Sequence, residues 1–179
     1  MVNSGLRIRI LVLQVGLIGI LLACSGFLLW GNRFVHGMIR EQLAAQQIFF
    51  PPAGSPGLRA EEFPDLQQYG GRQLDDGAAA RAYANGFIGR HLEAIAAGKT
   101  YSQVSTAARA NPTDAKLQGQ VDTLFKGETL RGLLLNAYGW WEVGQYALYA
   151  SASLAAVALA VLVALLFECA MLAAARRSS

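Results

Sequence analysis

The sequence predicts an all-α protein in which two transmembrane helices flank an extracytoplasmic helical domain. Three observations support this fold class. No charged residue occurs from Ile10 to Trp30, none occurs from Val143 to Phe167, and the apolar residues between these runs recur at helical spacing, without the alternation of strands. Each run reaches the roughly 20 apolar residues that a helix needs to cross a hydrocarbon core about 30 Å thick.

The two runs divide the chain into five predicted segments. These are a tail at 1–9, a first span at 10–30, an outer domain at 31–142, a second span at 143–174 and a tail at 175–179. Basic residues near a span are retained in the cytoplasm, and both tails carry them: Arg7, Arg9, Arg176 and Arg177. We therefore expect a multi-pass protein of the cytoplasmic membrane with both termini in the cytoplasm.

The net charge of +3 belongs mainly to these tails. Between Gly31 and Glu142, eleven Lys and Arg residues are balanced by eleven acids. Because no basic patch remains in the outer domain, a nucleic-acid partner is not expected. The only two cysteines, Cys24 and Cys169, fall in the apolar runs, so no disulfide framework is implied.

The stretch LLACSGFLLW, residues 21–30, can be interpreted in two ways. Small Ala23 before Cys24 has the layout of a lipoprotein signal, which would be cleaved and acylated at Cys24. However, the apolar run continues through Phe27 to Trp30, a length that suits an uncleaved span. We favour the uncleaved span, and acylation of Cys24 is the alternative.

Small residues recur along one face of each predicted span. In the first span they are Gly16, Gly19, Ala23 and Gly26, and in the second they are Ala152, Ala156, Ala160 and Ala164. Such faces let two helix backbones approach closely in a membrane. We therefore expect the two faces to pack together; the alternative is that Gly and Ala are simply common in membrane helices.

Aromatic and ionisable residues mark the predicted membrane boundaries. The aromatic residues expected at the interface are Trp30, Trp140, Trp141, Tyr146 and Tyr149. Glu168 is the only charged residue within 143–174. It either sits at the inner interface or lies in the bilayer with a proton-transfer or partner-pairing role.

The first half of the outer domain is predicted to extend and then interrupt the first helix. Helical spacing continues to Gln47, where the sequence QQIFFPP ends it because proline cannot donate a backbone hydrogen bond. A loop follows, then a short helical turn at 64–69. Asp75 or Asp76 can cap the next amphipathic helix, which Gly98 ends.

The second half is predicted to contain two more outer helices. Thr100 and Gln103 have capping-box spacing, and the helix that they start ends near Ala110. Thr113 or Asp114 can cap a further helix to Gly127. A separate segment then leads into the second span.

No set of residues specifies a reaction. His36 and His91 are the only histidines, and no third ligand accompanies them, so no metal site is expected. Neither a nucleophile-elbow pattern nor a phosphate-loop spacing is present. The sequence therefore predicts no catalytic residue, no cofactor-binding residue and no cofactor.

Three segments resemble those of a family of small actinobacterial two-span membrane proteins of unassigned function. They are IFFPP at 48–52, KTYSQVSTAARANP at 99–112 and TLFKGETLRGLLLNAYGWW at 123–141. The resemblance covers most of the outer segment and the start of the second span. It implies the two-span topology and no active site.

The leading functional hypothesis is a non-enzymatic accessory or interaction subunit that displays its helical domain outside the cytoplasmic membrane. The expected partners are membrane lipid and either another membrane protein or a second copy of the chain. One alternative is a ligand- or lipid-binding, sensor-like protein that signals through a partner. A less favoured alternative is an enzyme acting on an envelope lipid.

Overall fold

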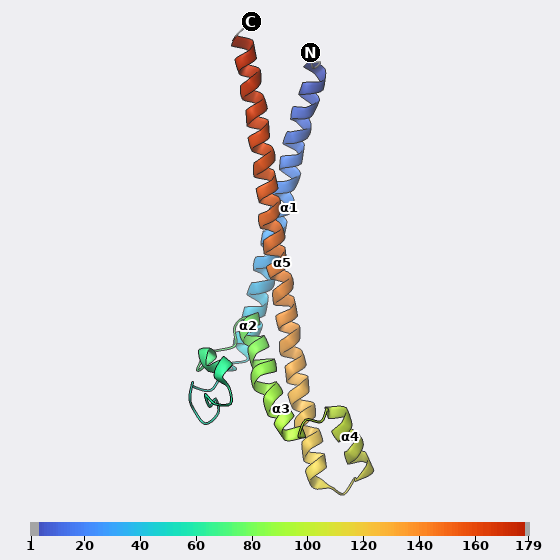
Figure 1. Cartoon of the computed structure of the whole chain (residues 1–179). Helices are drawn as coiled ribbons and strands as arrows, with labels where there is room; N and C mark the ends of the chain where they lie inside the picture. The colour runs from blue at the N-terminus through green and yellow to red at the C-terminus, as the bar shows by residue number, and fades with distance from the viewer. Residues whose placement is uncertain (1–3, 178–179) are drawn as a thin grey trace. The chain divides into compact units, whose positions relative to one another are not determined.

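A computed structural model describes residues 4–177, and every regular element in that range is helical (Figure 1). The elements are α1 (Ser4–Ala45), η1 (Pro64–Tyr69), α2 (Gly77–Arg81), η2 (Ala82–Ile88), α3 (Gly89–Ala96), α4 (Tyr101–Ala110) and α5 (Ala115–Arg177). Within the described range, the only β pairing is an isolated bridge between Phe49 and Gln73. The all-α class is confirmed.

The chain forms two compact units, which we describe separately. The first contains the residues up to Phe34 and those from Val143 onward, and the second contains Val35–Glu142. Helices α1 and α5 contribute residues to both units. The second unit, called the helical unit below, contains all the shorter helices.

Helices α1 and α5 are long and apolar enough to cross a membrane. In each, only 6% of the most apolar window is buried within the structure. A core helix of a water-soluble protein buries most of such a window, because exposing apolar side chains to water is unfavourable. The exposure of both helices therefore favours a hydrocarbon environment.

Most predicted helix boundaries are confirmed, and the capping residues explain them. The Asp76 carboxylate accepts a hydrogen bond from the Ala79 backbone N–H at 2.8 Å and starts α2. Thr100 and Gln103 form the reciprocal capping box that starts α4. The Asp114 carboxylate accepts from two backbone N–H groups at the start of α5, satisfying donors that lack intrahelical partners.

The predicted end of a helix at Gly127 is wrong, because α5 continues from Ala115 to Arg177. A glycine inside a helix costs only about 1 kcal/mol relative to alanine. Here it has a packing role: a Cβ at residue 127 would lie 2.9 Å from Leu92 Cδ1. Gly127 thus lets α3 approach α5 instead of ending the helix.

The helix between Asp76 and Gly98 changes its winding. Residues 77–81 and 89–96 are α-helical, whereas Ala82–Ile88 form a π-helix. π-Helical turns are rare in proteins as a whole. Those that do occur are often found at functional sites. The π-helix also passes close to η1, since a Cβ on Gly86 would lie 2.8 Å from Leu66 Cδ2.

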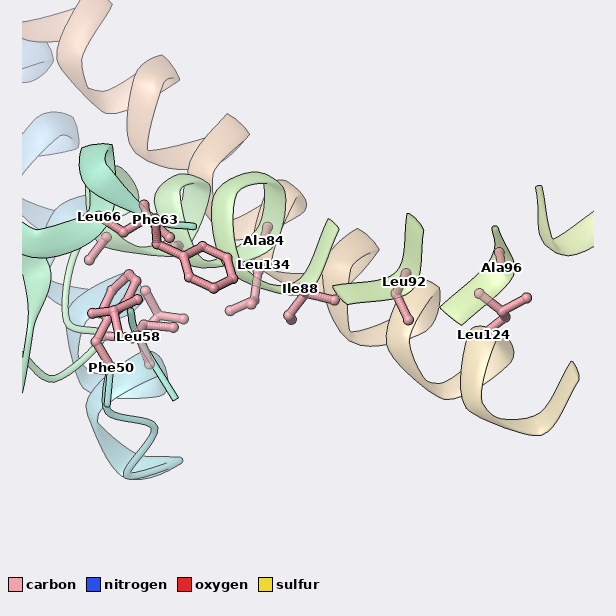
Figure 2. Packing of buried hydrophobic residues seen from close by; sticks show 14 of the residues in the cluster. Phe50, Leu58, Phe63, Leu66, Ala84, Ile88, Leu92, Ala96, Leu124 and Leu134 are labelled. Atoms are coloured by element: carbon pink, nitrogen blue, oxygen red, sulfur yellow. The ribbon is translucent and has the colours of Figure 1, made fainter. Parts of the chain in front are cut away.

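The core of the helical unit has two parts, shown in Figure 2. One part is a row on η2 and α3 that recurs at every fourth residue and packs against α5. The row is Ala84, Ile88, Leu92 and Ala96, and it meets Leu124 and Leu134. The other part comes from η1 and the loop before it, with Phe50, Leu58, Phe63 and Leu66. This core positions the grooves described below.

The first unit consists of α1 and α5 joined by polar contacts. The Ser25 hydroxyl donates to the Ser151 carbonyl at 2.9 Å, and the Ser151 hydroxyl donates to the Ser25 carbonyl at 2.8 Å. Asn32 Nδ2 donates to the Gly144 carbonyl at 2.8 Å. Both serines and Asn32 are buried, so the two helices approach closely here.

The predicted small-residue faces are not the contact faces. Among residues 4–177, a Cβ on Gly16, Gly19 or Gly26 would meet no atom beyond the adjoining turns of its own helix within 4 Å, and Ala23 is exposed. On α5, the exposed residues include Ala152, Ala156, Ala160 and Ala164. The Ser25 and Ser151 face has small side chains as well and adds hydrogen bonds, which explains why the helices pair there and leave the predicted faces outward.

Candidate functional site

A groove opens beside the π-helix in the helical unit. It has a volume of about 570 Å³ and is formed by η1, the helix at 77–90 and α5. We call it the π-helix groove. Its lining residues are Asp65, Leu66, Gln68, Tyr69, Ala78, Arg81, Ala82, Asn85, Gly86, Arg90, Tyr138, Trp141 and Glu142. The lining is rich in hydrogen-bonding and aromatic side chains, as a binding site for a polar ligand requires.

Arg81 lies over the ring of Tyr138. Its guanidinium carbon is 5.1 Å from the ring centroid, and Nη1 donates to the Tyr138 hydroxyl at 3.1 Å. Among residues 4–177, no carboxylate forms an ion pair with Arg81. The Arg81 guanidinium therefore brings to the groove a positive charge that is not in an ion pair.

Arg90 is held differently, by a bidentate contact with Asp65. Nη1 lies 2.8 Å from Oδ1, and Nη2 lies 2.9 Å from Oδ2. The hydrogen bond from Arg90 holds the pKa of the Asp65 carboxyl below its ordinary value. This pair ties η1 to α3 and is electrically neutral.

We expect the Asp65 and Arg90 pair to give the helical unit an acid-dependent loss of stability. Because the pKa of Asp65 is lower in the folded state, its contribution is present above the unfolded pKa of ~3.9 and is lost as pH falls through the folded value. The pair is solvent-exposed, so the loss is under about 1 kcal/mol. Thermal unfolding in micelles between about pH 7 and about pH 3 measures it. Asp65→Asn should remove this part of the pH dependence, and an unchanged profile would contradict the assignment.

Trp141 is a packing residue of the helical unit. Its ring stacks on His36 with centroids 3.9 Å apart, and its carbonyl lies 2.9 Å from His36 Nε2. Gly77 packs against the same indole, where a Cβ would lie 2.5 Å from Trp141 Cβ. Trp141 is therefore half-buried, and its interfacial position stays a prediction. Trp30, Trp140, Tyr146 and Tyr149 are each more than half exposed, and their interfacial position stays a prediction.

Asn85 connects the groove to an ion pair on α5. Its Oδ1 accepts from Arg131 Nη2 at 3.1 Å and from Nε at 3.3 Å, and Arg131 Nη1 lies 3.4 Å from Glu128. With Oδ1 occupied, the Nδ2 amide of Asn85 is the group left to donate a hydrogen bond. Asn85 belongs to the lining of the π-helix groove.

A second groove runs between α1 and α5 in the helical unit. It has a volume of about 320 Å³, and most of its lining is apolar. We call it the α1–α5 groove. Its lining residues are Met38, Ile39, Gln42, Leu43, Gln46, Leu130, Leu133, Leu134, Asn136, Ala137 and Trp140. Leu133 and Trp140 are 64% and 52% exposed, so an apolar surface remains uncovered within this chain.

No known family model, curated protein or solved structure matches this chain. The resemblance to actinobacterial two-span proteins therefore stays a prediction.

Glu168, the predicted intramembrane polar residue, has a partner in α1. Gln14 Nε2 lies 3.4 Å from Glu168 Oε1, and Gln14 Oε1 is buried with no hydrogen-bond partner among residues 4–177. Side chains on a helix lean toward its N-terminus, so residues on antiparallel helices can reach toward one another along the axis. Pairing with Gln14 is a structural role that the sequence alone did not indicate.

Of the remaining candidates from the sequence, His91 has structural contacts and the two cysteines do not form a disulfide. His91 Nδ1 lies 2.8 Å from the Phe87 carbonyl, and its ring stacks on Phe63. Among residues 4–177, no three His, Cys, Asp or Glu side chains are placed to hold a metal ion. Cys24 and Cys169 are both exposed and unpaired thiols.

The sequence did not predict that the residues of the π-helix groove line one common groove. Tyr138, Trp141 and Glu142 are spaced to share one helical face, and so are Arg81 and Asn85. The spacing of the residues within each helix can be read from the sequence. The pairing of the two faces is a tertiary contact, and periodicity within one helix does not identify the partner.

Proposed function

We propose that the chain is an integral protein of the cytoplasmic membrane that crosses it twice, with both termini in the cytoplasm. The helical unit then lies outside and serves as the binding module of a non-enzymatic accessory or interaction subunit. The length, apolar character and exposure of α1 and α5 support the membrane assignment. The basic tail residues support the orientation.

The observation that carries the interaction role is the α1–α5 groove. Two long helices leave an apolar furrow between them, and the exposed Leu133 and Trp140 lie along one side of it. Exposed apolar patches on a folded domain mark surfaces that bind a partner. A furrow between two helices fits an amphipathic helix, whose apolar side chains would enter it at three- and four-residue spacing.

Site-specific photocrosslinking in cells tests this proposal. A benzophenone side chain at position 133 or 140 should crosslink one protein, either a membrane-protein partner or a second copy of the chain. The matched controls are positions 132 and 139, which are exposed glycines one residue away on α5. Equal crosslinking at all four positions, or crosslinking only to lipid at 133 and 140, would refute a protein-binding groove.

A second candidate function is ligand or lipid binding by a sensor-like protein. The π-helix groove favours it, because a polar groove beside a π-helix has the features of a small-molecule site. The two candidates use different surfaces. They can therefore be tested independently in one protein.

In a bilayer, the Ser25 and Ser151 contact is expected to stabilise the helix pair by about 1 kcal/mol. A double-mutant cycle of Ser25→Ala, Ser151→Ala and the double variant should give a coupling energy of that size, measured by denaturant unfolding in bicelles. Ser153→Ala is the control, because its hydroxyl bonds only to the Tyr149 carbonyl of its own helix. A coupling energy near zero would mean that the serines do not hold the helices together.

A further inference from the structure

The π-helix groove presents one positive and one negative charge that are not paired with each other. Within residues 4–177, neither Arg81 nor Glu142 forms an ion pair, although both line the groove. The other two charged lining residues, Asp65 and Arg90, neutralise each other. A ligand that satisfies both free charges must carry an anion and a cation.

The two free charges are related through α5, where Tyr138 and Glu142 are about one helical turn apart. Arg81 lies over the ring of Tyr138, and Glu142 follows Tyr138 by four residues on the same helix. Four residues rise ~6 Å. We infer that the groove binds a phosphoethanolamine group, whose phosphate contacts Arg81 and whose ammonium contacts Glu142 across the short ethanolamine chain.

The Arg81 side of the groove is suited to phosphate. A guanidinium offers several N–H donors in a plane, a geometry that matches phosphate oxygens. The contact of Arg81 with the Tyr138 ring and hydroxyl holds its side chain at the groove. Only one donor, Nη1, is used by the Tyr138 hydroxyl. Asn85 adds its Nδ2 amide, since Oδ1 is already occupied by Arg131.

The Glu142 side favours a primary ammonium over a quaternary one. A quaternary ammonium has no N–H to donate and is recognised by open aromatic faces. The three aromatic rings of the groove are already in contact with other groups: Tyr138 with Arg81, Trp141 with His36, and Tyr69 with Phe50. A primary ammonium needs only the carboxylate of Glu142, to which it donates charge-assisted hydrogen bonds.

This chemistry can come from a lipid headgroup or from free phosphoethanolamine. Glu142 is the last charged residue before the apolar run Val143–Phe167, so a headgroup at the membrane surface is a natural source. The inference rests on the second candidate function, ligand binding. It is independent of the α1–α5 groove.

Native mass spectrometry of the full chain in phospholipid-free micelles tests the inference. Phosphatidylethanolamine and phosphatidylcholine with identical acyl chains are the probes. The ethanolamine lipid should bind about tenfold more tightly, because hydrogen bonds between charged groups carry this much free energy. Arg81→Gln should weaken ethanolamine-lipid binding about tenfold or more. Glu142→Gln should remove the preference while leaving phosphatidylcholine binding unchanged.

Two matched variants and a soluble probe complete the experiment. Arg109→Gln and Glu61→Gln change exposed charges outside the groove and should alter neither affinity nor preference. If Arg81→Gln disturbs the fold, Arg81→Lys keeps the charge and should retain part of the affinity. Soluble phosphoethanolamine that competes with the lipid identifies a free ligand, whereas its failure to compete identifies the membrane lipid.

Two results would overturn the inference. One is equal affinity of the wild-type chain for the two lipids. The other is an effect of Arg81→Gln and Glu142→Gln no larger than that of the two control variants. Binding of both lipids without preference would remove the phosphoethanolamine assignment and leave lipid binding intact. If neither lipid nor the soluble probe binds, both the phosphoethanolamine assignment and the lipid-binding function are wrong. The α1–α5 groove is tested separately, so photocrosslinking at position 133 would be unaffected.

Discussion

Gly77→Ala is expected to destabilise the helical unit by about 3 kcal/mol, at the upper end of the usual cost of overpacking. The added Cβ would lie 2.5 Å from Trp141 Cβ and 2.7 Å from Cδ1. Trp141 cannot rotate away freely because its other contacts include the stacked His36 ring. The start of α2 and the adjoining turn of α5 must therefore separate.

Hydrogen exchange of the full chain in micelles measures this effect. Amides of residues 77–96 should exchange roughly 100-fold faster in the variant, as a change of about 3 kcal/mol implies. Gly132→Ala is the matched control, because a Cβ there meets no atom within 4 Å. It should be neutral or stabilising by up to about 1 kcal/mol. Unchanged protection in Gly77→Ala would show that α2 does not depend on this contact with Trp141.

Local sequence signals predicted the helix boundaries well where a short-range hydrogen bond sets them. The cap at Asp76 and the capping box at Thr100 involve residues within three positions, so their geometry follows from the sequence itself. The turn at 64–69 also appears at the predicted place, as η1. By contrast, Gly127 was interpreted as a helix end, because its real partner, Leu92, is distant in the sequence.

The pairing face of the long helices was mispredicted for a similar reason. Stripes of glycine and alanine show where another helix backbone can approach. However, both helices carry more than one face of small residues. Ser25 and Ser151 combine small size with hydrogen bonds that only the pair can form. Which of these faces forms the contact depends on the sequences of both helices, and the sequence of one helix does not determine it.

The candidate grooves were beyond prediction from the sequence because they lie between elements. Arg81 and Glu142 are ordinary charged residues in the sequence, and only the packing of the helix at 77–96 against α5 brings them to one groove. The π-helix that carries Asn85 also had no local signal, since AYANGFI at 82–88 is compatible with an ordinary α-helix. Tertiary contacts therefore determine that residues 82–88 form a π-helix.

The stretch LLL at 133–135 illustrates how closely core and surface residues can alternate. Its sequence left open whether these leucines form a core or a partner surface. In the structure Leu134 is 2% exposed, whereas its neighbour Leu133 is 64% exposed. Figure 2 shows Leu134 beside Ala84 in the core of the helical unit. The two residues therefore provide a matched pair on one helix.

Leu134→Ala is expected to destabilise the helical unit by about 2–5 kcal/mol, the range for removing a buried leucine side chain. Leu133→Ala should stay within about 0.5 kcal/mol, because its side chain contributes little to this core. Helix propensity changes equally in both variants, so the difference reports packing alone. Urea unfolding in micelles, followed by circular dichroism, measures it.

The same pair of variants separates folding from function. If the α1–α5 groove binds a partner, Leu133→Ala should reduce photocrosslinking at position 140 while leaving the unfolding midpoint unchanged. Leu134→Ala should lower the midpoint, and any loss of crosslinking should follow the loss of folded protein. Equal destabilisation by the two variants would mean that Leu133 belongs to the core. It would also remove the exposed apolar surface on which the accessory role depends.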